Sequence, residues 1–117
     1  MQKIYKIEVF LPKKALKNIR MALYELGLGK IGNYDCCLSW QKVRSSWRPL
    51  NGANPFMGKV GKIEFAAEYK LEFRCSEKEL AQAVKAIKEN HPYEEVCINV
   101  LHLVEVDNMG LDFAAKL

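Results

Sequence analysis

One short stretch of the chain brings together an imidazole, a phenol and two carboxylates. His91, Tyr93, Glu94 and Glu95 lie within five consecutive positions, and borderline divalent ions accept a mixture of nitrogen and carboxylate ligands. One interpretation is a ligand site that includes Tyr93, with a divalent metal ion held by His91, Glu94 and Glu95. The other is structural, because Pro92 follows His91 and ends a helix there. We favour the structural interpretation, since one histidine with flexible carboxylates falls short of a usual metal site.

Two further segments place polar side chains beside glycines, where the backbone can approach a ligand or another chain closely. Asn33, Tyr34 and Asp35 follow a pair of glycines, and Asn54 lies in a glycine-containing run over residues 51–61. That run lacks the Lys-Ser/Thr pair of a phosphate-binding loop. We predict that these four residues contribute to ligand binding. An Asx turn in the first segment, and a plain loop or an oligomer contact in the second, explain the same patterns.

No nucleophile is accompanied by a base in the sequence. The four serines have no histidine and aspartate close to them in the chain, and nucleophilic catalysis needs both in space. The four cysteines show no Cys-x-x-Cys spacing, which argues against a zinc knuckle or a disulfide framework. Cys36 and Cys37 are predicted to point to opposite faces of a strand, so they would not bind one ion together. We therefore expect a protein without catalytic activity, with an enzyme of unrecognised site as an alternative.

Trp40 and Trp47 are large apolar side chains in a segment that also carries Lys42, Arg44 and Arg48. Tryptophan and arginine are enriched at the centres of protein interfaces. We therefore predict that both tryptophans lie at a contact between subunits. A stacking platform for bases would need several more spaced aromatic residues, so we expect no nucleic-acid partner.

Composition fits a small globular protein. The chain of 117 residues is 50% hydrophobic and 27% charged, which suits a single domain over residues 1–117. No apolar run is long enough to span a bilayer and no secretory signal opens the chain, so we expect no membrane association and a cytoplasmic location. Residues 1–62 hold twelve basic and three acidic residues, whereas residues 63–117 hold six and eleven. Such opposed halves pair across a fold or between subunits.

These residues must be positioned by regular elements, and hydrophobic periodicity predicts six of them. Two helices show apolar residues at three- and four-residue steps; the first begins at Pro12 and the second opens with a Ser76–Glu79 capping box. Alternation predicts four strands, of which residues 63–73 are the clearest. The side of this strand that faces the core is predicted to hold Ile63, Phe65, Ala67, Tyr69, Leu71 and Phe73. The elements in chain order are a strand over residues 3–11, a helix from 12 to about 27, strands over 34–49 and 63–73, a helix from 76 to about 91 and a strand over 96–106.

This order predicts an α+β protein with the ferredoxin-like β-α-β-β-α-β arrangement, in which two helices cover one face of an antiparallel sheet. Residues 107–117 are predicted to form a short helix or a packing arm. The open sheet would leave unpaired edges in residues 34–49 and 96–106, and edges of this kind are protected when another chain covers them. We therefore predict a homo-oligomer assembled through these edges.

Three segments resemble a known family. They are residues 29–35 (Gly-Lys-Ile-Gly-Asn-Tyr-Asp), residues 52–64 (Gly-Ala-Asn-Pro-Phe-Met-Gly-Lys-Val-Gly-Lys-Ile-Glu) and residues 91–95 (His-Pro-Tyr-Glu-Glu). Together they resemble the CutA/PII-like domain that is inserted into YqfO-type proteins of the Nif-three-like, dinuclear-metal-centre hexameric family, a domain that also occurs alone. The resemblance covers nearly the whole chain.

The resemblance implies a function and an assembly. CutA proteins form trimers and are linked to divalent-cation tolerance, and PII proteins are trimeric metabolite sensors. The resemblance therefore implies a regulatory module that binds a small molecule or a divalent metal, and it places a trimer ahead of a dimer. The dinuclear metal centre of the longer family members is not carried over, because His91 and His102 are the only histidines. A purely structural domain for oligomerisation and protein interaction is the alternative.

Overall fold

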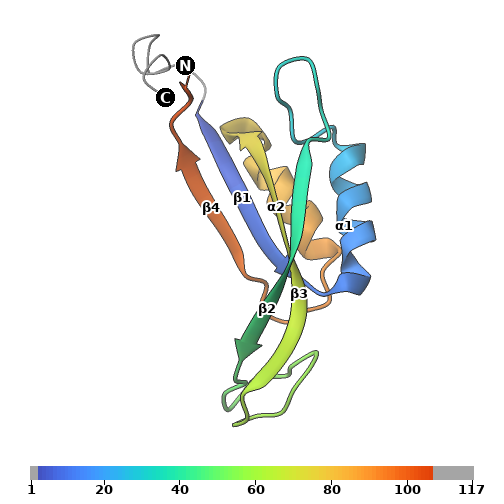
Figure 1. Ribbon diagram of the computed structural model, residues 1–117, viewed down its shortest axis with the longest axis vertical. Helices are drawn as coiled ribbons and strands as arrows, with labels where there is room; N and C mark the ends of the chain where they lie inside the picture. Colours follow the sequence, from blue (N-terminus) through green and yellow to red (C-terminus); the bar gives the residue numbers. More distant parts are fainter. Residues whose placement is uncertain (1–2, 107–117) are drawn as a thin grey trace.

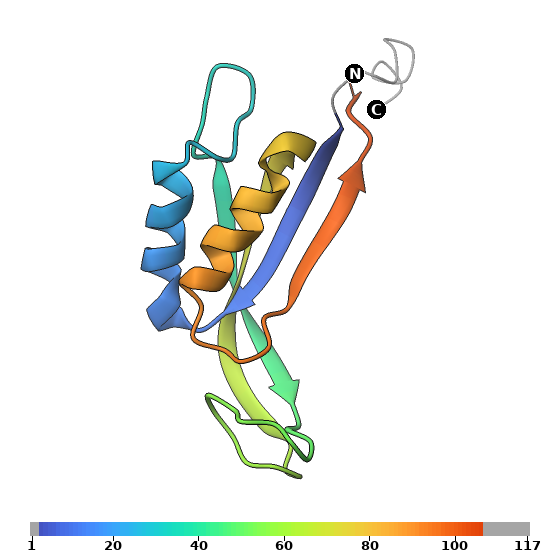
Figure 2. The same ribbon diagram turned by 180° about the vertical axis from the view of Figure 1, so that it is seen from behind.

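The chain forms a layer of strands covered on one side by a layer of helices (Figures 1 and 2). The computed structural model describes residues 3–106. Two α-helices pack on the same face of the sheet, and this is the order of elements that the hydrophobic periodicity predicts. The elements are β1 (Ile4–Leu11), α1 (Lys13–Glu25), β2 (Leu38–Trp47), β3 (Glu64–Ser76), the 3-10 turn η1 (Glu77–Glu79), α2 (Leu80–Glu89) and β4 (Ile98–Leu103).

The four strands are antiparallel and lie in the order β2-β3-β1-β4. The two strands in the middle are β3 and β1, and their register sets Val9 opposite Leu71. On the other side of β1, Val9 lies opposite Ile98 of β4. The edges of the sheet are therefore β2 and β4, the two segments in which the sequence predicts unpaired edges.

The core lies between the sheet and the helices. Ile7, Val9 and Leu11 alternate along β1 and are fully buried, because alternate side chains of a strand share one face. Ile19 and Leu23 are four residues apart on α1, so they lie on the same side of the helix, and both are fully buried against the sheet. Each such side chain contributes roughly 1.5–3 kcal/mol to folding. Among residues 3–106, no helix has the length and apolarity that a bilayer crossing requires.

The ends of the helices follow from particular residues. Gly27 has a φ of 65° after α1, and the next amide, that of Leu28, donates to Leu23 O over 3.2 Å, which is the geometry of a left-handed helix cap. Before α2, the Ser76 N–H and the Ser76 hydroxyl both donate to Glu79 Oε1 over 3.0 Å. The predicted capping box is therefore confirmed, although its first turn is the 3-10 turn η1.

The β2–β3 pair continues beyond the rest of the sheet. The last residue of β1 lies opposite Tyr69, yet the β2–β3 ladder runs on to the pair Trp47 and Glu64. Residues 43–68, here called the arm, therefore extend past the helices (Figure 1). Ile63 and Phe65, predicted to face the core, are 58% and 68% exposed. That prediction was wrong because neither α1 nor α2 lies over this part of the sheet.

Two other strand predictions need correction. The second strand begins at Leu38 rather than at residue 34, so Cys36 and Cys37 precede it. Cys36 has a positive φ of 57°, and its thiol lies 3.9 Å from Tyr24 O. The argument that these cysteines face opposite sides of a strand therefore does not apply. The last strand ends at Leu103 rather than at residue 106. The short helix or packing segment predicted for residues 107–117 lies outside the described residues.

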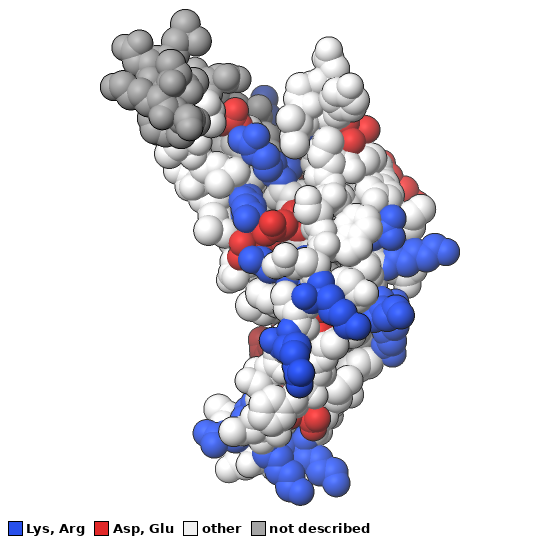
Figure 3. Space-filling model, in the orientation of Figure 1, with Lys and Arg blue, Asp and Glu red and all other residues white. Residues whose placement is uncertain are grey.

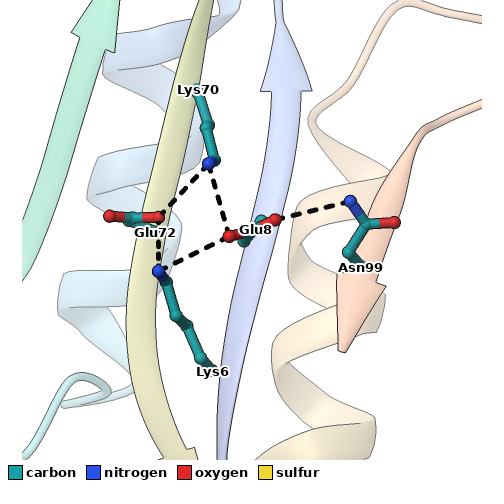
Figure 4. Close-up of polar contacts among 5 residues, drawn as sticks. All are labelled: Lys6, Glu8, Lys70, Glu72 and Asn99. Carbon is teal, nitrogen blue, oxygen red and sulfur yellow. Dashed lines mark hydrogen bonds and ion pairs between the residues drawn. The ribbon is translucent and has the colours of Figure 1, made fainter. Parts of the chain in front are cut away.

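The face of the sheet opposite α1 and α2 carries a set of alternating charges (Figure 4). Lys6 Nζ lies 3.0 Å from Glu72 and 3.5 Å from Glu8, while Lys70 Nζ lies 3.3 Å from Glu8. The Asn99 amide donates to the other oxygen of Glu8 over 3.4 Å. Glu72 and Glu8 raise the pKa of Lys6 by stabilising its charged form. Two cations and two anions thus balance at the centre of this open face.

Gly29 is the position where an added methyl group should cost most in the turn before β2. Its φ is 77°, and a Cβ there would lie 2.8 Å from Cys37 O and 2.9 Å from Cys37 N. We expect Gly29→Ala to lower the free energy of unfolding by about 1–3 kcal/mol, as for other strained backbones. Gly32→Ala is the control, because it has a φ of 56° but nothing within 4 Å of the added carbon. Urea unfolding that gives equal losses for both variants would contradict the close-contact explanation.

Candidate functional site

The loop of the arm and the connection from α2 to β4 enclose a cleft of about 700 Å³. Figure 2 shows this connection, in orange, crossing below the end of β1 and just above the green loop of residues 48–63. Glu68 is two residues from Lys70 along β3, so the cleft opens on the face of the sheet opposite α1 and α2. Its walls are mostly apolar or aromatic. The lining residues are Phe10, Ser45, Ser46, Trp47, Arg48, Pro49, Leu50, Asn51, Gly52, Ala53, Pro55, Phe56, Met57, Glu68, Tyr93, Glu94, Glu95 and Cys97.

Tyr93 lies at the centre of this site. Its hydroxyl donates to Glu68 Oε2 over 2.6 Å, a short bond to a carboxylate that is only 6% exposed. The ring centre lies 6.5 Å from that of Trp47 and 5.7 Å from that of Phe56. Burial raises the pKa of Tyr93, and the nearby Glu68 raises it further. Tyr93 therefore stays a neutral phenol that donates to Glu68.

His91 packs against the Tyr93 ring and is hydrogen-bonded to the Tyr93 backbone. The imidazole is buried, and its Nε2 lies 2.7 Å from the carbonyl oxygen of Phe10, at the end of β1. The Tyr93 N–H donates to Nδ1 over 3.2 Å. This pair of contacts requires the neutral tautomer with the proton on Nε2. Burial lowers the pKa of His91, even though the hydrogen bond to Phe10 and the negative charge of Glu68 act in the opposite direction.

Three contacts fix the loop of the arm against its surroundings. The Asn54 N–H donates to Glu94 Oε2 over 2.8 Å, which joins the two walls of the cleft. The indole N–H of Trp47 donates to Met57 O over 3.2 Å. Lys14 Nζ, on the first turn of α1, lies 4.5 Å from the centre of the Phe56 ring. The loop is therefore tied to the α2–β4 connection, to β2 and to α1.

The neutral state of His91 predicts a pH dependence of stability. Its pKa is lowered in the folded protein, so the unfolded chain binds this proton more readily. The contribution of neutral His91 to the free energy of unfolding is complete above the unfolded pKa of about 6.5. It is lost, at up to about 1.4 kcal/mol per pH unit, as the pH falls toward the folded pKa. We expect His91→Gln to be less stable than the parent at pH 8, with a gap that narrows below pH 6.5. Urea unfolding between pH 8 and 5 measures the gap; a gap that stays constant would contradict the neutral assignment.

The structure separates the predicted ligand residues into two groups. Asn54, His91, Tyr93 and Glu94 gather at the cleft. The other group, residues 33–35, lies in the loop between α1 and β2, at the opposite end of the molecule (Figure 1). There a tight turn closes through two hydrogen bonds between Ile31 and Tyr34, of 2.9 and 3.0 Å, and the Tyr34 side chain is 75% exposed. One ligand cannot contact both groups on a single chain.

The predicted metal ligands do not converge. Both ring nitrogens of His91 already contact the backbone, at Phe10 and Tyr93, and Glu94 accepts from Asn54. Glu95 is exposed on the wall of the cleft. Within residues 3–106 there is no group of three His, Cys, Asp or Glu side chains that could hold a metal ion. Metal binding by these residues stays a prediction that this arrangement does not favour.

The two tryptophans have different surroundings. Trp40 is 40% exposed on the edge strand β2, and the guanidinium of Arg20 lies 4.3 Å from its ring centre. Trp47 lines the cleft and contacts its loop.

Sequence reasoning missed Glu68 and Phe56 as site residues. Glu68 has the same alternating position as the half-buried polar residues of β3, so only its deeper burial beside Tyr93 distinguishes it.

The order of the elements and of the strands is that of the ferredoxin-like fold, which CutA and PII structures share. The CutA structure from Archaeoglobus fulgidus, described as a periplasmic divalent cation tolerance protein, superposes with a TM-score of 0.66 at 20% identity, over 99% of this chain and 97% of that one. The Arabidopsis thaliana PII structure bound to citrate gives 0.59 at 19% identity, over 90% and 84%. At these identities the likeness concerns the fold alone.

A family model described as CutA1 divalent ion tolerance protein matches residues 58–116, and the chain belongs to this family. A Bacillus cereus protein related to NIF3 superposes with a TM-score of 0.78 at 29% identity, over 89% of this chain and 26% of that one. A Staphylococcus epidermidis protein named GTP cyclohydrolase 1 type 2 homolog is 34% identical over 113 residues, which are 97% of this chain and 31% of the relative. The chain thus spans about a third of the length of such relatives. The predicted resemblance to CutA/PII-like domains and to the Nif-three-like family is confirmed.

Proposed function

We propose that this chain is a non-catalytic ligand-binding module of the CutA/PII type. Its binding site is the cleft between the loop of the arm and the α2–β4 connection. The observation that carries the proposal is the Glu68–Tyr93 pair, a buried carboxylate and a phenol held among aromatic rings in a cleft of about 700 Å³. Largely apolar clefts of this size with a few convergent polar groups are the usual form of small-molecule sites. The ligand is a small molecule, with a divalent ion as the competing candidate.

The protonation states of the site favour binding over catalysis. A raised pKa makes Tyr93 a poor proton donor to a substrate near neutral pH, and its hydroxyl is already engaged by Glu68. His91 uses both ring nitrogens in contacts with the backbone, so it has no free position for a substrate. These groups are arranged to hold the walls of the cleft together and to present a fixed surface to a ligand.

Calorimetry with a panel of divalent ions, nucleotides, carboxylates and amines tests the proposal. The variant is Phe56→Ala, which removes one aromatic wall of the cleft but changes a side chain that is 42% exposed. The control is Tyr34→Ala, which removes an exposed aromatic side chain at the other predicted ligand segment. We expect saturable binding that Phe56→Ala weakens and Tyr34→Ala leaves intact. The reverse result would move the site to residues 33–35, and no binding by any member of the panel would reject the proposal.

A second candidate role is self-assembly, and the exposed edges of the sheet favour it. On the edge strand β4 and just beyond it, Val100 and Leu101 are each 43% exposed and Val104 is 67% exposed. On the opposite side of the molecule, basic side chains gather over α1, the lower part of β2 and the arm (Figure 3). Unpaired edges and apolar surface are both relieved when another copy covers them. We propose a homo-oligomer, with a trimer ahead of a dimer and with Trp40 and Trp47 near the contact.

Sedimentation equilibrium at micromolar concentration measures this assembly. We expect a trimer mass for the parent protein and a lower mass for Leu101→Glu, which places a charge on the exposed side of β4. Lys85→Glu is the control, because Lys85 lies on α2 with a 76% exposed side chain. A dimer mass would keep the edge contact and reject the trimer, whereas a monomer mass for the parent would reject self-assembly.

A further inference from the structure

The charges that face the cleft do not balance. Three carboxylates line it, from Glu68, Glu94 and Glu95, and Arg48 is the one basic residue among its lining residues. Glu94 is engaged by the Asn54 N–H, which is a neutral donor and leaves the carboxylate charge in place. The cleft therefore has an excess of negative charge, although basic side chains gather on the surface of the arm (Figure 3).

Of the three carboxylates, Glu68 is the buried one, and burial makes an unpaired charge costly. The residue is 6% exposed, and one of its oxygens accepts from the Tyr93 hydroxyl. No Lys, Arg or His nitrogen of residues 3–106 lies within 4.0 Å of its carboxylate, and no hydrogen bond among these residues uses Oε1. Buried carboxylates are normally paired with a cation, because one hydrogen bond replaces little of the lost hydration. Glu68 therefore has no cationic partner among the described residues, and its carboxylate lines the cleft.

The aromatic walls suit a cationic ligand. Trp47, Phe56 and Tyr93 border the cleft, and the ring centres of Phe56 and Trp47 lie 5.7 and 6.5 Å from that of Tyr93. The faces of such rings attract cations, and organic cations with weakly hydrated charge gain most. Phe56 already holds a cation in this way, because Lys14 Nζ lies 4.5 Å from its centre. An anionic ligand would be repelled by Glu68, and a neutral one would gain hydrogen bonds and apolar contact but no attraction between charges.

We propose that the cleft binds a small organic cation, an alkylammonium or guanidinium compound, with its charge at Glu68 and its apolar part against the aromatic rings. This inference rests on the proposed function and adds the chemical class of the ligand. A bare metal ion fits less well, since no three side chains among the described residues converge as its ligands. The cleft volume of about 700 Å³ accommodates a molecule rather than an ion.

Trp47 can report on this binding directly. The chain contains two tryptophans, so Trp40→Phe leaves Trp47, on the cleft wall, as the sole indole. In that background, the fluorescence of Trp47 is titrated with choline and with its neutral isostere 3,3-dimethylbutan-1-ol, and likewise with 2-phenylethylamine and 2-phenylethanol. We expect each cation to bind at least about tenfold more tightly than its neutral counterpart, the ratio that one cation–aromatic contact with partial desolvation provides.

The charge of Glu68 is tested by an isosteric change. Glu68→Gln keeps the shape of the side chain and a hydrogen-bonding partner for Tyr93, so we expect it to weaken each cation at least about tenfold while leaving the neutral isosteres unchanged. Glu72→Gln is the matched control, four residues away on the same strand and the same face but outside the cleft. It should change neither affinity.

The outcomes separate this inference from the proposed function. Equal affinity for cations and neutral isosteres, or equal losses for Glu68→Gln and Glu72→Gln, would overturn the cation assignment. Preferential binding of citrate, ATP or Zn²⁺ that perturbs Trp47 would also overturn it, yet would keep the cleft as the binding site. Absence of any response at Trp47, together with calorimetry in which Phe56→Ala weakens no ligand, would reject the cleft and with it the proposed function.

Discussion

Leu71→Ala should lower the free energy of unfolding by about 2–5 kcal/mol, the usual range for a large side chain removed from a core. Leu71 is fully buried on β3, one of the two central strands, where it lies opposite Val9 of β1 and Trp40 of β2. The sheet and the helices hold the surrounding side chains in place, so the cavity that the substitution leaves can close only partly. Urea unfolding followed by circular dichroism measures the loss.

Phe65→Ala is the control for this change. Phe65 lies on the same strand and the same alternating face as Leu71, six residues away, but its side chain is 68% exposed. We expect the free energy of unfolding to change by less than about 1 kcal/mol, since exposed positions contribute little. The sequence alone predicts two core residues here and two similar losses. Similar losses would therefore show that a further element, or another chain, covers the arm.

The contrast between these residues explains what sequence periodicity can predict. Alternation along β3 identifies which residues share a face, and the pairing of Val9 with Leu71 agrees with that assignment. The pattern does not say whether a helix lies above each part of the face. α1 ends after 13 residues and α2 after 10, so the helices cover only part of the 13-residue strand β3. Element order and helix ends depend on local signals and were therefore predictable, and the sheet edges followed from the arrangement that this order implies.

The candidate site was predictable in part for a related reason. His91, Tyr93 and Glu94 are adjacent in the chain and carry distinctive side chains, so sequence reasoning could select them. Glu68 is 25 residues from Tyr93, and the contact between them depends on the path of the α2–β4 connection beneath the end of β1. Residues 33–35 showed a similar local pattern and lie at the other end of the molecule. Local patterns select chemistry, whereas long-range contacts decide which groups meet.

Tyr93→Ala should have the other large effect, a loss of about 3 kcal/mol or more in the free energy of unfolding. The substitution removes the ring contacts with Trp47, Phe56 and His91, of which the last has a centre-to-centre distance of 4.7 Å. It also leaves the buried Glu68 carboxylate without its donor. Tyr93→Phe separates the two contributions, because it keeps the ring and deletes only the hydroxyl. We expect it to cost about 1.5–3 kcal/mol, the usual value of a hydrogen bond to a charged group.

A double-mutant cycle between Tyr93→Phe and Glu68→Gln isolates the bond between the two side chains. Glutamine is neutral, so the missing hydroxyl no longer leaves a buried charge without a donor. The double variant should therefore lose less stability than the two single losses added together, by about 1–2 kcal/mol, as is usual for residues in direct contact. Unfolding at pH 7 gives all four free energies under one condition. Strict additivity would mean that the 2.6 Å contact contributes no coupling, and that Glu68 is stabilised by other groups.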